Sequence, residues 1–244
     1  MFSVRALGRH VGAASLAGII AGVLIAGVLG RIAMRVSGFM SRPELVGVST
    51  ANGNRVGEIT LSGTLGLALF VGIPAGILGA VLFASAEPWL RRVRPWQGVL
   101  FGLILLLFSG FAFIEPTNLD FRRFGSAAIN IAMFGGLFVA FGALIAWLFD
   151  RIRPAMEGNR TSARVLEVVA FGAALAVIAL SVLFFVSIGG LSDPALLVLF
   201  AGVAIVPAIV LWRGLPPVIA YAVFAVAVLL GAWRTLSGVS EMLL

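Results

Sequence analysis

The sequence contains no cysteine, no lysine and a single histidine. Without cysteine the chain cannot hold a disulfide, an iron–sulfur cluster or a thiol redox pair. Without lysine it cannot form the Schiff base of a retinal protein, although such proteins also have seven helices. His10 alone supports neither bis-histidine haem ligation nor a histidine-based metal triad. We therefore expect no metal, no cofactor and no redox chemistry.

Charge is also scarce, because 11% of the 244 residues are charged, against about 25% in soluble domains. All 17 basic residues are arginine, which favours a bacterial source, and with 10 acidic residues they leave a net charge of +7. In a soluble domain such a charge would indicate nucleic-acid binding. Here the arginines are spread over the loops, where anionic lipid headgroups are the expected partners, and we exclude nucleic acid.

What the chain has is apolar sequence, with 61% hydrophobic residues and a mean hydropathy of +1.14. A hydrocarbon core of roughly 30 Å needs about 20 helical residues to cross it. The first apolar run is followed by arginines rather than by a small-residue cleavage site, so we expect it to be retained as a helix. The sequence predicts one all-α membrane domain over 1–244, with seven spans at 11–30, 60–85, 98–114, 126–149, 166–188, 195–212 and 216–233.

Arginine counts predict the orientation of these spans. With a cytoplasmic N-terminus, ten arginines lie on the inner side and seven on the outer side. Because cytoplasmic loops gather positive charge, this split favours a multi-pass protein of the cell membrane with its N-terminus inside and its C-terminus outside.

The longest polar stretch, 31–59, separates the first two predicted spans. Within it, Asn52 and Gly53 stand between valine-containing arms, a pattern typical of a type I′ β-hairpin. We therefore predict a short extracytoplasmic hairpin. It could act as a lid or a docking ribbon, and the favoured interpretation is that it closes a long loop.

Small residues recur every four positions in the first two predicted spans, and they include Gly18, Gly22, Gly72 and Gly76. Such stripes let helix backbones approach closely in lipid, so we assign these four glycines to helix packing. Pro74 removes a backbone hydrogen bond inside the second span and predicts a kink, as Pro207 does in the sixth.

Within the predicted spans the polar side chain that is costliest to leave unpaired is Asn130. A hydrogen bond between helices explains it better than a transport site does. The densest group of other polar residues lies on the predicted outer face. There the arginines are candidates for binding an anion or a lipid headgroup, since guanidinium groups bind phosphate bidentately, although loop salt bridges are the favoured interpretation. The candidate arginines are Arg31, Arg35, Arg122 and Arg123, with Glu58, Glu115 and Asp120 as acidic partners.

Three classes of function remain. The packing stripes and the lack of central charges favour a non-catalytic accessory or structural subunit of a membrane assembly, with lipids, other subunits or a second copy as partners. Kinked spans favour a transporter or channel for a small solute or a lipid. An enzyme that processes lipid headgroups would need outer-face carboxylates and is the third choice. We predict the first class.

Overall fold

The computed structural model describes residues 4–41, 60–112, 114, 124–158 and 217–244, together with isolated helical positions between 164 and 179. The described residues are helical and contain no β-strand. The predicted hairpin, most of the fifth predicted span, all of the sixth and Pro207 lie outside them.

The first long helix is α1 (Val4–Gly22), which continues without a break through the π-helical segment η1 (Val23–Leu29) into α2 (Gly30–Phe39). It therefore extends beyond the predicted end at residue 30. Arg31 and Arg35 lie within the helix rather than in a loop after it. The length of an apolar run indicates how many residues lie in the hydrocarbon core. The helix itself can continue past that level because its backbone groups satisfy one another's hydrogen bonds.

The second long helix consists of α3 (Leu61–Leu67), the π-helical η3 (Ala68–Gly72) and α4 (Ile73–Leu90), followed by the 3₁₀ turn η4 (Arg91–Val93). Thr60 caps its start, since the backbone N–H of Gly63 donates to the Thr60 hydroxyl at 3.2 Å. The π-helical turns end at Gly72, two residues before Pro74, the proline for which we predicted a kink. Proline cannot donate a backbone hydrogen bond, and neighbouring π turns are one way in which a helix accommodates it.

The third predicted span is shorter than expected. Its helix α5 (Gln97–Ser109) has 13 residues and is followed by the 3₁₀ turn η5 (Gly110–Ala112). A helix of that length rises about 20 Å, less than the thickness of a hydrocarbon core. The fourth and seventh predicted spans instead lie in longer helices, α7 (Ala127–Gly158) and α10 (Pro217–Leu243).

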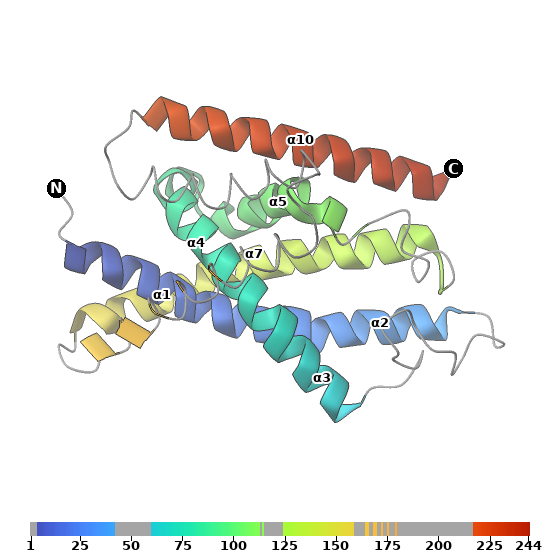
Figure 1. Ribbon diagram of the computed structural model, residues 1–244, viewed down its shortest axis with the longest axis horizontal. Coiled ribbons are helices and arrows are strands. Elements are labelled where there is room, and N and C mark those ends of the chain that lie inside the picture. The colour runs from blue at the N-terminus through green and yellow to red at the C-terminus, as the bar shows by residue number, and fades with distance from the viewer. Residues whose placement is uncertain are drawn as a thin grey trace.

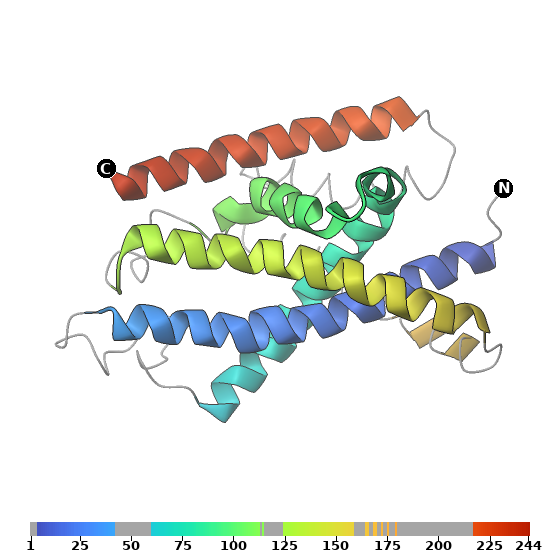
Figure 2. The same cartoon turned by 180° about the vertical axis from the view of Figure 1, so that it is seen from behind.

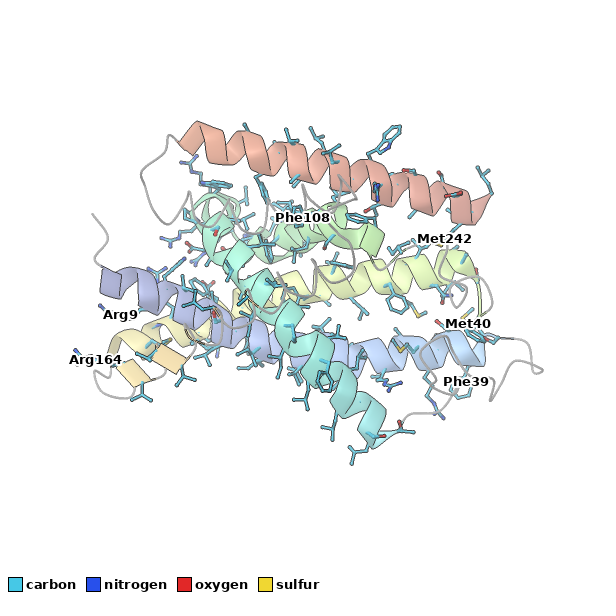
Figure 3. The ribbon with its side chains drawn as sticks, viewed as in Figure 1. Arg9, Phe39, Met40, Phe108, Arg164 and Met242 are labelled. Atoms are coloured by element: carbon cyan, nitrogen blue, oxygen red, sulfur yellow. The ribbon has the colours of Figure 1, made fainter. Side chains whose placement is uncertain are left out.

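Three described helices are long and apolar enough to cross a membrane, over Gly8–Phe39, Leu61–Val93 and Ala127–Met156. In Figures 1 and 2, α7 lies beside the α1–η1–α2 helix, while α3–η3–α4 crosses that helix obliquely. α5 packs on the other side of α7 and α10 packs on α5, where Phe108 of α5 faces α10 (Figure 3). The chain is thus a helical bundle with several spans of membrane length.

The aromatic core of the bundle joins α4, α5 and α7. The ring of Phe83 meets the rings of Phe101 and Phe149 edge to face, with centroids 5.1 and 5.4 Å apart. All three side chains are fully buried. Each such aromatic pair contributes about 0.5–1.5 kcal/mol beyond the burial of its area.

Candidate functional site

A buried carboxylate marks one end of the bundle. Glu87, near the end of α4, has a side chain only 3% exposed and accepts two hydrogen bonds from Arg91, at 2.8 Å from Nε and 2.6 Å from Nη2. Nη1 of Arg153, from α7, lies 3.8 Å from the same carboxylate oxygen. Two guanidinium groups from two helices therefore neutralise a charge that would be costly to bury alone.

His10 joins this group from α1. Its Nε2–H donates to the carbonyl oxygen of Ala84 at 3.1 Å, and its ring meets Phe149 edge to face with centroids 5.1 Å apart. The structure thus places this histidine in the contact of α1 with α4 and α7.

A second ion pair lies at the same end. Nη2 of Arg94 donates to Asp150 at 2.9 Å, and the side-chain amide of Gln97 donates to the other oxygen of that carboxylate at 3.1 Å. This pair is half exposed, with 53% of the arginine and 40% of the aspartate side chain accessible. We call the group formed by His10, Glu87, Arg91, Arg94, Asp150 and Arg153 the charged end.

The four glycines assigned to helix packing meet at the crossing of the first two long helices. A Cβ atom placed on Gly18 would lie 2.2 Å from the carbonyl oxygen of Gly76, and one placed on Gly22 would lie 1.9 Å from that of Gly72. At such distances not even a methyl group fits. The two backbones are therefore in direct contact.

A second glycine crossing joins α5 to α7. A Cβ atom on Gly102 would lie 2.5 Å from the carbonyl oxygen of Phe138, and one on Gly142 would lie 2.3 Å from that of Gly98. The sequence analysis missed this contact, although Gly98 and Gly102 show the same four-residue spacing. Close backbone contact is thus used twice in the bundle.

Asn130 connects α7 to α2 at the end of the bundle opposite the charged end. The hydroxyl of Ser37 donates to its side-chain oxygen at 2.5 Å, and its amide donates to the carbonyl oxygen of Phe124 at 2.7 Å. Asn130 is 3% exposed. The side chain thus takes part in a hydrogen bond between two helices.

The substitution Ser37→Ala should reduce the free energy of unfolding in detergent by about 0.6 kcal/mol, the average for a side-chain hydrogen bond between membrane helices. The matched control is Ser41→Ala, which removes only a local bond from the Ser41 hydroxyl to the Ser37 carbonyl. Unfolding titrated with a denaturing detergent measures both variants. Equal stability of the two variants would show that the bond to Asn130 contributes nothing.

Arg31 and Arg35 lie on α2, near the end of the bundle that carries Phe39 and Met40 (Figure 3). Arg31 is buried, with 8% of its surface exposed, whereas the guanidinium of Arg35 lies over the ring of Phe39, 5.0 Å from its centroid. The other members of the predicted anion cluster lie outside the described residues: Arg122, Arg123, Glu58, Glu115 and Asp120. The described residues therefore do not include the carboxylates on which an enzyme site was predicted.

The described part of the chain contains no group of three or more His, Asp or Glu side chains placed to hold a metal ion. Among its ionisable groups, Arg94 pairs with Asp150 and Arg153 approaches Glu87 across helices. The described geometry is that of a helical membrane bundle tied together at one end by charge.

Comparison with known proteins agrees with this class. A stretch of 67 residues, 27% of the chain, is 40% identical to a protein of Desulfitobacterium hafniense (strain Y51) named a UPF0060 membrane protein. The aligned part covers 56% of that protein, a little more than half of its length. No family model and no solved structure matches the chain. The similarity and the apolar helices together show that the chain is a polytopic membrane protein.

Proposed function

We propose that the chain is a non-catalytic subunit of a membrane assembly, a rigid helical scaffold to which other membrane helices bind. The observation that carries this proposal is the direct backbone contact at the crossing of α1–η1–α2 with α3–η3–α4. There a single methyl group would lie within 2.2 Å of a carbonyl oxygen at Gly18 and Gly22. Helices in such contact form a fixed frame and leave no passage between them at that level.

The outer surface of this frame suits a partner helix. Phe70 on η3 is 82% exposed and Leu61 on α3 is 76% exposed, and Leu65 and Leu69 between them are also exposed. These large apolar side chains lie on the helix that leans away from the rest of the bundle in Figure 1. A partner with small residues facing this row would gain close packing that lipid chains do not provide.

The proposal includes the topology predicted from the sequence. All seven apolar segments would enter the cell membrane, the third as a short helix. The N-terminus would be cytoplasmic and the C-terminus outside. A hairpin would close the first outer loop. α1 starts at the charged end, α4 and α7 finish there, and α10 starts there, as alternating spans require (Figure 1). The arginines of this end favour the cytoplasmic side.

A photo-crosslinking residue at position 70 tests the subunit proposal in the native membrane. We expect one protein adduct of constant mass, and native mass spectrometry of the gently purified chain should give a fixed stoichiometry with the same partner. The control places the crosslinker at Trp233 on α10, which is 74% exposed. A chain that purifies alone, with adducts to lipid only at both positions, would contradict the proposal.

A transporter is the second candidate, and one observation favours it. The π-helical segments η1 and η3 face each other at the helix crossing, where a Cβ atom on Gly27 would lie 2.8 Å from that of Ala68. Such turns are rare and are often found at functional sites. If the chain purifies alone and its liposomes release a solute that protein-free liposomes retain, the transporter replaces the subunit.

A further inference from the structure

Arg31 is a buried cation in a helix long enough to cross the membrane. It is 8% exposed and lies within the apolar stretch Gly8–Phe39. Among the described residues its Nε atom has no hydrogen-bond partner, and no carboxylate of that set pairs with it. A guanidinium in such surroundings is costly, and its donors require an acceptor.

The guanidinium lies against the first turn of α3. A Cβ atom on Gly63 would lie 1.7 Å from Nη2 of Arg31 and 2.8 Å from its Cζ, so glycine leaves the space that the group occupies. The Thr60 hydroxyl oxygen lies 2.8 Å from the same Cβ position. That oxygen accepts the backbone N–H of Gly63, which leaves its own proton for another acceptor.

The depth of this residue matches the edge of the hydrocarbon core. Phe39, the last residue of the helix, is eight residues further on, which corresponds to about 12 Å of helix. The middle of the Gly8–Phe39 stretch lies about as far away in the other direction. An arginine at that depth can extend its guanidinium to the level of the lipid headgroups.

We propose that Arg31 and the Thr60 hydroxyl bind a phosphate group, carried by an anionic lipid that enters between α2 and α3. The planar guanidinium offers two parallel N–H donors, which match two oxygens of one phosphate, and the hydroxyl offers a third donor. Gly63 keeps the space open. The site does not depend on whether the chain acts as a subunit or as a transporter.

Thermal-shift titrations of the purified chain in a maltoside detergent, at constant ionic strength, test this site. Three ligands are compared, namely dihexanoyl phosphatidylglycerol, inorganic phosphate and an uncharged dihexanoyl glycerol. Phosphatidylglycerol should stabilise the wild-type chain and the uncharged lipid should not. If inorganic phosphate binds as tightly as the lipid, the site still binds phosphate, and its source is the free anion.

The variant Arg31→Gln should weaken binding of phosphatidylglycerol about tenfold or more, because it removes a charge-assisted bidentate contact. Arg31→Lys should lie between it and the wild type. Arg92→Gln is the matched control, since it removes one exposed arginine at the charged end, and its affinity should stay within about twofold of wild type.

Gly63→Ala keeps every charge and places a methyl group where Nη2 lies, so it too should weaken binding even if Arg31→Gln fails to fold. Equal affinities of Gly63→Ala, Arg31→Lys and the wild type would overturn the proposal. So would a wild-type chain that binds neither phosphatidylglycerol nor inorganic phosphate.

Discussion

Replacing Gly22 with leucine should remove most of the folded protein. A Cβ atom at this position would lie 1.9 Å from the carbonyl oxygen of Gly72 and 2.8 Å from its carbonyl carbon. These are backbone atoms, so no change of rotamer relieves the overlap, and the two helices must separate. Overpacking in a core typically costs about 1–3 kcal/mol and sometimes more, and we expect the upper end because three further atoms of leucine must also fit.

The measurement is the fraction of the purified chain that elutes as a single species in size-exclusion chromatography, together with its melting temperature. Gly136→Leu is the matched control, because a Cβ atom at Gly136 on α7 would meet no atom within 4 Å. Leucine also favours a helix more than glycine does. If both variants fold like the wild type, the contact of α1–η1–α2 with α3–η3–α4 is not close enough to exclude a side chain.

The Gly22 contact also shows how far the sequence could predict the packing. Small residues four positions apart place Gly18 and Gly22 on one face of a helix, and that spacing predicts a close neighbour in lipid. The same spacing occurs on α4 and α5, so the pattern alone does not say which helix meets which. The pairing depends on the connections between helices and on the shape of the whole bundle.

Helix ends were predicted less well than helix faces. Apolar runs placed the ends near residues 30 and 149, whereas the helices continue through Arg35 and Arg153. Hydropathy measures where lipid ends, and a helix can continue beyond that level because its backbone satisfies its own hydrogen bonds. The third span was predicted to be too long, because its apolar run continues beyond Ser109, where α5 ends.

The charged end was not predicted as a site. Glu87 stands next to Pro88, just after the predicted span 60–85, and was not among the candidate residues. Its pairing with Arg91 could have been read from the i, i+4 spacing once the helix was known to reach that far. The approach of His10 and Arg153 could not, because each is separated from Glu87 by more than 60 residues and only the folded bundle brings them together.

Breaking the ion pair between the buried Glu87 and Arg91, whose side chain is 49% exposed, should cost more than breaking the Arg94–Asp150 pair beside it, in which both side chains are about half exposed. Arg91→Gln removes both hydrogen bonds to Glu87 and leaves a carboxylate whose side chain is 3% exposed with Arg153 at 3.8 Å. Removing one partner of a buried pair costs about 3–5 kcal/mol. We expect about 2 kcal/mol, below that range, because Arg91 is half exposed and the remaining arginine compensates in part.

Arg94→Gln is the natural comparison, since it removes an arginine of the same end whose pair with Asp150 is about half exposed. Exposed pairs contribute about 0–1 kcal/mol because water solvates both charges. Unfolding by denaturing detergent gives both free energies. If the two substitutions cost the same, burial of Glu87 does not govern the stability of this end.

The double variant Glu87→Gln, Arg91→Gln separates the charge from the shape. If the cost of Arg91→Gln arises from an uncompensated buried carboxylate, a neutral amide at position 87 should recover a large part of it. Additive losses would mean instead that the two side chains act through packing alone. Recovery would show that the charge of Glu87, held between α4 and α7, makes this end of the bundle depend on its arginines.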